Sequence, residues 1–412
     1  MKLIKDYSEE VYKCSKCGLC QAVCPVFEAT GLETAVSRGK FTLLNAALNG
    51  KIEFNKNLSK YLDLCLGCKA CYDFCPSGIS AEEIINTAKY HSYKLNGLGF
   101  LKQFIVTNFE SKINLSLLRL LVHIYRTTGL IKLAQIATNI IKPLKNPVDL
   151  FNTQVKENIR YKKLSSKKDG SQLKIAYFPG CINNYVNSSV KNSVMMVLER
   201  NGFKVQIPDF SCCGIPARSA GNIDSFVKLA KDNLEKIDSD IDYLITDCAS
   251  CGSVWKIYED VLYGELKEKA AIIAEKAINI NKFLTIQDIY IPNNLEINKS
   301  VTYHDPCHLK RFQEVYQEPR EILKRIPGLE FLEMEDADKC CGAAGTFCVS
   351  NPEISKLISA QKAKNILNTN ADIVATSCPS CKIGITQGLI QNDKQIPIYQ
   401  PVELLASLYL ME

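Results

Sequence analysis

The sequence lacks the features by which membrane proteins and the common enzyme classes are recognised. No run reaches the roughly 18 apolar residues that a membrane-spanning helix needs. No Rossmann dinucleotide fingerprint, serine or cysteine triad, or pair of catalytic carboxylates stands out. A net charge of +6 over 412 residues is too small to indicate nucleic-acid binding. The balance of 46% hydrophobic and 23% charged residues is that of an ordinary globular protein.

The N-terminal segment also lacks the apolar stretch of a secretory signal. Residues 1–12 are rich in charged side chains, and no cleavage site follows them. We therefore expect the chain to stay in the reducing cytoplasm. In that compartment its 19 cysteines point to metal binding or catalysis, and not to the disulfide framework of a short secreted protein.

The cysteines divide the chain into three parts. Eight lie between Cys14 and Cys75, none lies between Cys75 and Cys181, and eleven follow. The cysteine-free part has apolar residues at helical spacing over 98–144 and is polar and lysine-rich over 145–174. These patterns predict a helical connector, ended by prolines, and then a linker.

The first eight cysteines form two copies of one spacing, Cys-x2-Cys-x2-Cys-x3-Cys-Pro. In bacterial two-cluster ferredoxins the fourth cysteine of each such run binds the other cluster. Iron in a cubane cluster prefers soft thiolate ligands, which this pattern supplies in two full sets. The predicted ligands of the first [4Fe–4S] cluster are Cys14, Cys17, Cys20 and Cys75, and those of the second are Cys65, Cys68, Cys71 and Cys24.

Zinc sites or buried free thiols are the alternative for these eight cysteines. Four-cysteine zinc sites usually pair two Cys-x2-Cys knuckles and need neither a third cysteine at that spacing nor a following proline. The spacing therefore favours iron–sulfur clusters. Gly18 and Gly67 lie inside the two loops, where the backbone must approach inorganic sulfide and φ can be positive.

The C-terminal part contains an internal repeat. A strand-like run ending at Phe178 leads to Cys181, and a second run, Val301–His304, leads to Cys307. Each run is followed by a Cys-Cys-Gly motif and then by a Cys-x2-Cys motif, with helical stretches between them. Strands that alternate with helices predict a small α/β unit, and the unit is present twice.

Each repeat supplies five cysteines in the same order. Five thiolates exceed the four ligands of one tetrahedral zinc ion, and adjacent cysteines reach different irons of a cluster more easily than they reach one ion. We expect an iron–sulfur cluster of unusual shape in one or both repeats, with structural zinc as the alternative. The predicted ligands are Cys181, Cys212, Cys213, Cys248 and Cys251 in the first repeat, and Cys307, Cys340, Cys341, Cys378 and Cys381 in the second.

A few other residues near the cysteine sets invite a functional interpretation. We expect the nineteenth cysteine, Cys348, to be a buried free thiol. His304 and His308 flank Cys307, and we expect them to donate hydrogen bonds to cluster sulfur in preference to binding metal. The segment Gly342–Gly345 lacks the spacing of a nucleotide-binding loop.

A basic segment follows the N-terminal cysteines. No acidic residue occurs between Ser111 and Val148, and the segment is amphipathic. We expect a helical connector that packs under the cysteine sets with its charges in solvent. The alternative is contact with anionic lipid, which would make the chain peripheral on the inner face of the cell membrane.

The whole pattern resembles the iron–sulfur subunit of glycolate oxidase. The order of motifs is the same, and the resemblance extends to Ser37–Lys40, to His304–Cys307 and to Cys340–Thr346. The paired-cysteine sets resemble the cysteine-rich "CCG" domain of heterodisulfide reductase, in which such a set holds a noncubane [4Fe–4S] cluster. Some family members lack part of a five-cysteine set, whereas this chain keeps all ten cysteines.

The resemblance implies a fold of mixed α and α/β class. We expect an N-terminal α-helical ferredoxin domain, a helical linker and two tandem α/β CCG domains. The expected boundaries are 1–97 for the ferredoxin-type domain, 98–172 for the connector and linker, 173–295 for the first CCG domain and 296–412 for the second.

The resemblance also implies a role in electron transfer. We expect the iron–sulfur subunit of a glycolate or D-lactate dehydrogenase complex, which takes electrons from an FAD-binding subunit and passes them toward quinone or another respiratory acceptor. On its own the chain would not oxidise the hydroxy acid. The alternatives are the iron–sulfur subunit of anaerobic glycerol-3-phosphate dehydrogenase and a heterodisulfide-reductase-like enzyme with catalytic noncubane clusters. No nucleic-acid partner is expected.

Overall fold

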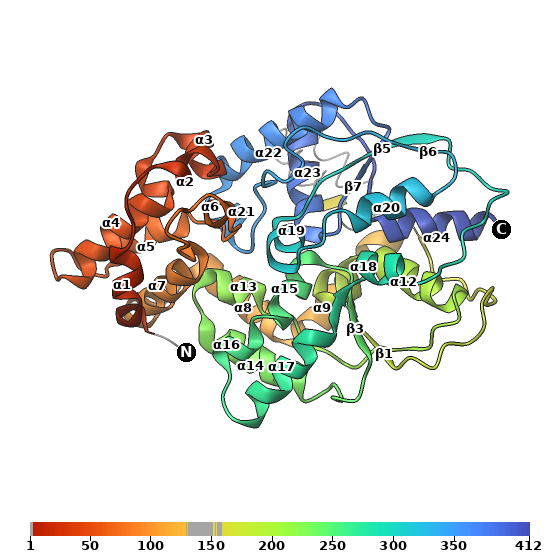
Figure 1. Cartoon of the computed structure of the whole chain (residues 1–412), viewed down its shortest axis with the longest axis horizontal. Coiled ribbons are helices and arrows are strands. Elements are labelled where there is room, and N and C mark those ends of the chain that lie inside the picture. Colours follow the sequence, from red (N-terminus) through yellow and green to blue (C-terminus); the bar gives the residue numbers. More distant parts are fainter. Residues whose placement is uncertain (1–2, 129, 131–150, 153, 155–158) are drawn as a thin grey trace.

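The computed structural model describes residues 3–128, 130, 151–152, 154 and 159–412 (Figure 1). Residues 4–96 are built from helices around a core that includes Tyr7, Leu44, Leu62 and Ile84. Asn55 caps α5 by accepting hydrogen bonds from the backbone N–H groups of Asn57 and Leu58. The elements are η1 (Ile4–Tyr7), α1 (Ser8–Tyr12), α2 (Leu19–Ala22), α3 (Pro25–Thr30), η2 (Glu33–Ala35), α4 (Ser37–Leu48), α5 (Lys56–Asp63), α6 (Ala70–Asp73) and α7 (Ala81–Asn96).

Two further helices, α8 (Phe100–Glu110) and α9 (Lys112–Thr127), lead from this region toward the C-terminal part. Helix α9 buries Leu115 and Val122 but leaves a row of apolar side chains exposed, namely Ile113, Leu117, Leu120, Leu121 and Ile124. The connector predicted over 98–144 is thus helical up to residue 127. The expectations for 131–150, including Pro143, Pro147 and the basic residues of that stretch, lie outside the described residues.

The first repeat forms a four-stranded parallel sheet in the order β2-β1-β3-β4. Helices connect the strands, as parallel pairing requires. The elements are β1 (Ile175–Phe178), η4 (Ile182–Val186), α12 (Ser189–Arg200), β2 (Val205–Gln206), α13 (Ile215–Ala220), α14 (Ile223–Leu234), β3 (Tyr243–Thr246), α15 (Ala249–Trp255), α16 (Tyr258–Val261), α17 (Glu265–Lys276), β4 (Ala277–Asn279) and α18 (Ile280–Ile286).

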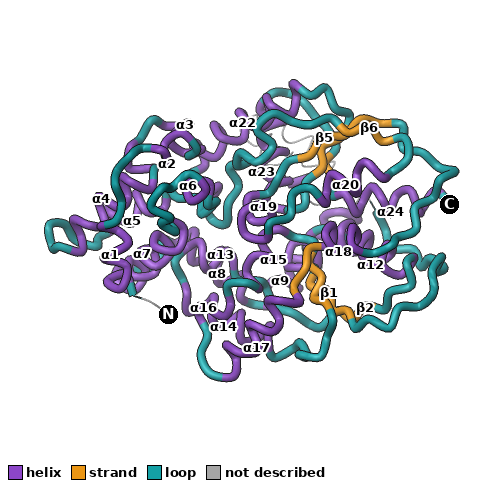
Figure 2. The backbone as a smooth tube through the Cα atoms, in the orientation of Figure 1, coloured by secondary structure: helices purple, strands orange, loops and turns teal. Residues whose placement is uncertain are grey.

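The second repeat forms a separate parallel sheet, in the corresponding order β6-β5-β7-β8. Figure 2 shows its strands β5 and β6 apart from β1 and β2 of the first sheet. The elements are β5 (Lys299–Tyr303), α19 (Cys307–Gln313), α20 (Glu318–Arg325), β6 (Leu329–Phe331), α21 (Phe347–Ser350), α22 (Pro352–Asn368), β7 (Ile373–Ala375), α23 (Pro379–Gln391), β8 (Ile398–Tyr399) and α24 (Pro401–Met411). The helical N-terminal region and two α/β units expected from the sequence are confirmed, while the exact domain boundaries stay a prediction.

The two repeats pack against each other through matching helices. Helix α12 contacts α24, and α20 contacts α18. In their own repeats α12 and α20 both follow the first strand, and α18 and α24 both follow the last. One core is shared by the two repeats and contains Val197, Phe283, Tyr303 and Leu405. This packing brings the cysteine-bearing ends of the two sheets close together.

Among the described residues, no helix combines the length and the apolar character that crossing a bilayer demands.

Candidate iron–sulfur sites

The eight N-terminal cysteines line two neighbouring cavities. The first cavity is lined by Cys14, Cys17, Cys20, Cys71 and Cys75, and Cys71 also lines the second. The second is lined by Cys24, Cys65, Cys68 and Cys71. The structure therefore brings the last cysteine of each motif to the other motif, which is the crossed grouping that the spacing suggests. The assignment of ligands to individual clusters stays a prediction.

The two cysteine loops share one backbone geometry. Gly18 and Gly67 have positive φ angles of 90° and 67°, and so do Lys16 and Lys69, at 57° and 58°. In each loop the left-handed residues flank the middle cysteine, and one of them is glycine while the other is lysine. A left-handed conformation is costly for lysine, so the same turn is imposed on both loops by the fold around them. Of these four residues, only the glycines were recognisable from the sequence.

The segment Ser37–Lys40, at the start of α4, lies between the two cavities. Ser37 donates a hydrogen bond from Oγ to the Sγ of Cys71 over 3.1 Å. Arg38 donates from Nη1 to the carbonyl oxygen of Lys16 over 3.2 Å, which holds the first loop. Its Nε also forms an ion pair with Glu33 at 2.5 Å. The resemblance singled out this segment, and these contacts give the physical reason.

Lys40 is fully buried beside the second cavity. Its Nζ donates to the carbonyl oxygens of Thr34, at 3.1 Å, and of Ala35. Burial lowers the pKa of Lys40, while the nearby thiols of Cys65 and Cys24 act in the opposite direction. A buried ammonium group beside a thiolate set stabilises additional negative charge there.

Replacing Lys40 by methionine is expected to lower the reduction potential of the cluster bound in the second cavity. The reduced cluster carries one more negative charge, and the variant no longer balances it. We expect a shift of roughly 50–100 mV, measured by redox titration followed by EPR. The control is Lys60→Met, at an exposed lysine of α5. An unchanged potential in Lys40→Met would contradict the electrostatic role.

In the first C-terminal repeat all five cysteines are buried. The Sγ atoms of Cys181 and Cys212 lie 3.7 Å apart. Cys251 contacts the thiols of Cys213 and Cys248, and these contacts together with burial raise its pKa well above the ordinary value. Without metal the thiol of Cys251 is protonated, so metal binding at this residue releases a proton and weakens as the pH falls.

A glycine makes room for this set. Gly180 has a φ of 67°, and a Cβ atom at this position would lie 2.8 Å from the Sγ of Cys251. Both the backbone conformation and the close approach exclude a larger side chain.

The second repeat arranges its cysteines in the same way. Cys307 opens α19 after the first strand, and Cys378 precedes α23 after the third. Contacts with Cys341 and Cys378, together with burial, raise the pKa of Cys381 well above the ordinary value. Cys307 is half-buried, and the other four cysteines of the set are buried.

The two five-cysteine sets meet at the contact between the repeats. The thiols of Cys248 and Cys378 interact, although they belong to different repeats. The backbone N–H of Ala249 donates to the carbonyl oxygen of Ser377 over 2.9 Å, which fixes this contact. Ten thiols are thus gathered in one continuous region.

The second N-terminal cavity adjoins the second repeat. Cys24 and Cys68 pack in one apolar cluster with Cys340, and α3 contacts α22. Burial raises the pKa of Cys68, and the thiols of Cys340 and Cys307 add to this shift. Figure 1 shows α3 and α6 beside α21 and α22. The four cysteine sets therefore follow one another in space: the set of the first cavity, that of the second cavity, that of the second repeat and that of the first repeat. At one end Cys17 is exposed, and at the other end the cysteines of the first repeat are buried.

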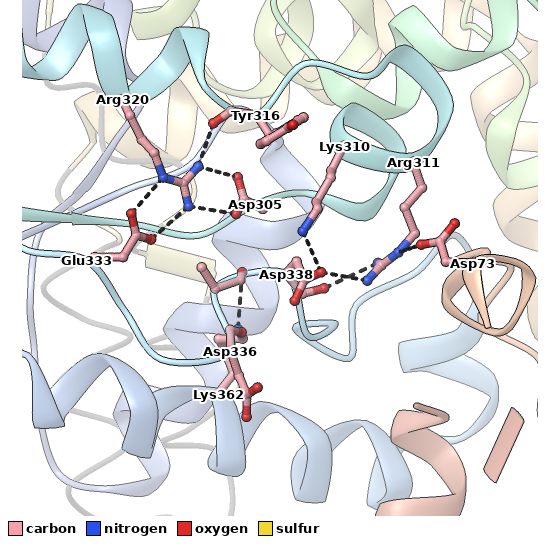
Figure 3. A network of polar contacts seen from close by, with 11 residues as sticks. Asp73, Asp305, Lys310, Arg311, Tyr316, Arg320, Glu333, Asp336, Asp338 and Lys362 are labelled. Carbon is pink, nitrogen blue, oxygen red and sulfur yellow. Dashed lines mark hydrogen bonds and ion pairs between the residues drawn. The ribbon is translucent and has the colours of Figure 1, made fainter. Parts of the chain in front are cut away.

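Ion pairs hold this junction in place (Figure 3). Arg311 of α19 pairs with Asp73 of α6 at 3.1 Å and with Asp338 at 3.0 Å. Lys310 pairs with the same Asp338 at 2.7 Å. The network links the N-terminal helices to the second repeat. Sequence reasoning missed it because the partners are far apart in the chain.

The structure also places the three other residues noted in the sequence, which are Cys348, His308 and His304. Cys348, expected to be buried, is a half-buried free thiol. His308 places Nδ1 2.9 Å from the Oγ of Ser253. His304 is 1% exposed, and burial lowers its pKa to about 3, so its imidazole is neutral. One of its ring nitrogens and the Sγ atoms of Cys341 and Cys381 lie within 4.8 Å of one another.

Soft thiolates in these numbers and groupings fit iron–sulfur clusters. Comparisons with known proteins also point to iron–sulfur binding. Residues 10–79 match the family model of the 4Fe-4S dicluster domain, and residues 175–255 and 301–386 match that of the cysteine-rich CCG domain.

Similar proteins cover almost the whole chain. The probable glycolate oxidase iron–sulfur subunit of Bacillus subtilis is 28% identical over 92% of this chain and 89% of its own length. An uncharacterized iron–sulfur protein of Methanococcus maripaludis is 30% identical over 98% of this chain and 75% of its own. A subunit of the dihydromethanophenazine:CoB–CoM heterodisulfide reductase of Methanosarcina acetivorans is 26% identical over 96% and 93%. The chain belongs to the family of the glycolate oxidase iron–sulfur subunit, in which a 4Fe-4S dicluster domain precedes two CCG domains.

Proposed function

We propose that the chain is the electron-transfer subunit of a complex that oxidises a 2-hydroxy acid such as glycolate or D-lactate. It would receive electrons from an FAD-binding subunit and pass them toward quinone or another respiratory acceptor. The observation that carries this proposal is the continuous order of four cysteine sets, from the exposed Cys17 to the buried first repeat. When bound, iron–sulfur clusters supply one-electron transfer, which a flavin that has accepted an electron pair requires.

The surface beside the first cavity, where Cys17 is exposed, could bind a redox partner. Leu19, Tyr72 and Phe74 are 49%, 47% and 54% exposed, and Leu19 and Phe74 also line the first cavity. Exposed apolar side chains beside a cofactor site favour docking of another protein. The buried sets of the two repeats would form the other end.

Purification from native cells tests the proposal. A tagged chain, isolated without oxygen, is expected to bring down an FAD protein. Glycolate or D-lactate should then bleach the visible absorbance of the complex, but not that of the isolated chain. Bleaching by glycerol 3-phosphate instead would favour the alternative dehydrogenase. A colourless, iron-free chain without a flavoprotein would contradict the proposal.

A second candidate function is disulfide reduction at the paired-cysteine sets. A cavity between the N-terminal helices and both repeats is lined by Cys307, Cys340 and Cys381, together with His308 and Arg218. Such a cavity admits a small molecule to the thiol region, and a heterodisulfide reductase subunit is among the relatives. Turnover of a disulfide by the isolated, reduced chain would support this function, and its absence would leave electron transfer alone.

Peripheral membrane contact through α9 is the remaining element of the proposal. The exposed apolar row of this helix, from Ile113 to Ile124, is of the kind that lies in a lipid interface. If this row contacts lipid, which is the alternative to a simple connector, the chain will float with anionic liposomes at low salt, and Leu117→Glu will abolish flotation. The control, Leu95→Glu on α7, should float as the native chain does. Failure of the native chain to float would leave α9 as a connector or protein-docking helix.

A further inference from the structure

His304 is buried, and neither ring nitrogen makes a well-formed hydrogen bond. The side chain is 1% exposed, and within the described part of the chain neither Nδ1 nor Nε2 has a partner of good geometry, although the carbonyl oxygen of Ala337 lies near enough to act on the ring. A buried polar group without a partner costs free energy, and native structures nearly always provide one. The imidazole therefore points to a partner other than the protein's own polar atoms.

The two charged groups that act on the ring of His304, those of Lys362 and Asp305, have other partners. Figure 3 shows Asp305 paired with Arg320. The carboxylate of Asp305 accepts two hydrogen bonds of 2.8 Å from Arg320. Lys362 donates from Nζ to the carbonyl oxygens of Asp336, at 2.6 Å, and of Ala337, at 3.3 Å. The backbone of His304 is fixed because its N–H donates to the carbonyl oxygen of Ala375 over 2.9 Å. These groups therefore leave at least one nitrogen of the ring without a hydrogen bond.

The ring faces sulfur. One nitrogen of His304, the Sγ of Cys341 and the Sγ of Cys381 lie within 4.8 Å of one another, and all three residues are buried. Imidazole nitrogen suits iron, and histidine replaces cysteine on one iron of the Rieske type of cluster. Three converging soft or borderline donors form a site for metal.

The first repeat lacks this nitrogen. Phe178 and His304 each lie three residues before the first cysteine of their set. Phe178 is fully buried, and its ring packs against Phe210 and Trp255 at centroid distances of 4.9 and 5.4 Å. The two repeats therefore have matching cysteines but differ in one donor.

We propose that His304 supplies a nitrogen ligand to the metal centre of the second repeat, beside Cys341 and Cys381. The unprotonated ring nitrogen donates its lone pair to iron. The second repeat then holds a mixed imidazole–thiolate centre, whereas the first holds a thiolate centre. This proposal rests on the cluster-binding role proposed above, and it replaces the sequence-based expectation that His304 donates a hydrogen bond to cluster sulfur.

Pulsed EPR with ¹⁵N-labelled histidine tests the assignment. The chain has only four histidines, so the label enters few positions. Protein purified without oxygen is measured in both the reduced and the oxidised state. We expect the strong coupling of an iron-bound imidazole, changed by the label, lost in His304→Phe and kept in His308→Gln. His304→Phe copies the residue of the first repeat. His304→Cys should bind the cluster without the imidazole coupling and shift the potential of the centre downward, because it adds a negative charge.

The unmodified protein alone can overturn the proposal, so the outcome does not depend on the folding of a variant. Iron-loaded protein without labelled coupling in either state, or with only the weak coupling of a hydrogen-bonded nitrogen, would exclude ligation by His304 and leave the proposed function intact. Loss of the strong coupling in His308→Gln, or its survival in His304→Phe, would assign the nitrogen to another residue. Protein without iron would remove the proposed function as well.

Discussion

A Cys75→Ser variant is expected to lose the cluster of the first cavity, about four irons per chain, and to keep the other. Cys75 lies in the second motif but lines the cavity of Cys14, Cys17 and Cys20. An oxygen ligand replaces a soft thiolate poorly, so the first cluster is lost and the electron path is cut at its exposed end. We expect at least a hundredfold lower rate of substrate-dependent reduction of an artificial acceptor in the complex if electrons enter there. Iron analysis and EPR measure the loss of the cluster directly.

The reciprocal variant identifies which cluster remains. Cys24→Ser should remove the cluster of the second cavity, which is the one beside Lys40. Adding Lys40→Met should therefore shift the remaining potential in Cys75→Ser but not in Cys24→Ser. The matched control is Cys348→Ser, because Cys348 belongs to neither motif and should leave the iron content unchanged. A potential that responds to Lys40→Met in the Cys24→Ser background would show that the fourth ligands are not crossed.

Removing the guanidinium group of Arg218 is expected to weaken the docking of the N-terminal helices on the first repeat. Arg218 of α13 forms a buried ion pair with Glu82 of α7. In Arg218→Ala the carboxylate stays buried without its partner, which costs about 3–5 kcal/mol. The double variant Glu82→Met/Arg218→Met removes both charges and should recover most of that loss. Guanidinium denaturation, followed by circular dichroism and visible absorbance, compares the three proteins; equal losses in the single and double variants would contradict this account.

The same pair gives stability a dependence on pH. Burial raises the pKa of Glu82, but Arg218 outweighs it, so the pKa lies below the ordinary value of 4.5. A carboxyl group with a lowered pKa contributes stability that is complete above pH 4.5 and is lost as the pH falls through the folded-state pKa. In Arg218→Ala burial is opposed only by the smaller contributions of Lys69 and His308, so the pKa of Glu82 rises above its ordinary value. The variant should then lose stability as the pH increases above 4.5, which is the opposite slope.

The cysteine motifs were predictable because their information is local. A spacing of two or three residues fixes which thiols lie in one loop, whatever the rest of the chain does. The strand ends before Cys181 and Cys307 were predictable for the same reason. Neither the contact of Cys68 with the second repeat nor the pairing of Cys248 with Cys378 follows from spacing, because both depend on how separate units pack.

Other features were visible in the sequence but could not be interpreted from it. His304 was noted beside Cys307, yet a sequence does not show that both ring nitrogens lack a well-formed hydrogen bond. Ser37–Lys40 was noted as similar to a family segment, and only the structure relates it to the loops of both motifs. The left-handed conformation of Lys16 and Lys69 could not be predicted from the sequence, since lysine rarely adopts that conformation.

The reciprocal contacts of α12 with α24 and of α20 with α18 suggest how this architecture arose. An interface that uses the same surface on both sides is that of a symmetric homodimer. Duplication and fusion of a gene for such a dimer would produce the observed arrangement in a single polypeptide. In a homodimer one gene encodes both subunits, whereas in the fused chain each copy can mutate separately. Matching positions can then differ, as Phe178 and His304 do.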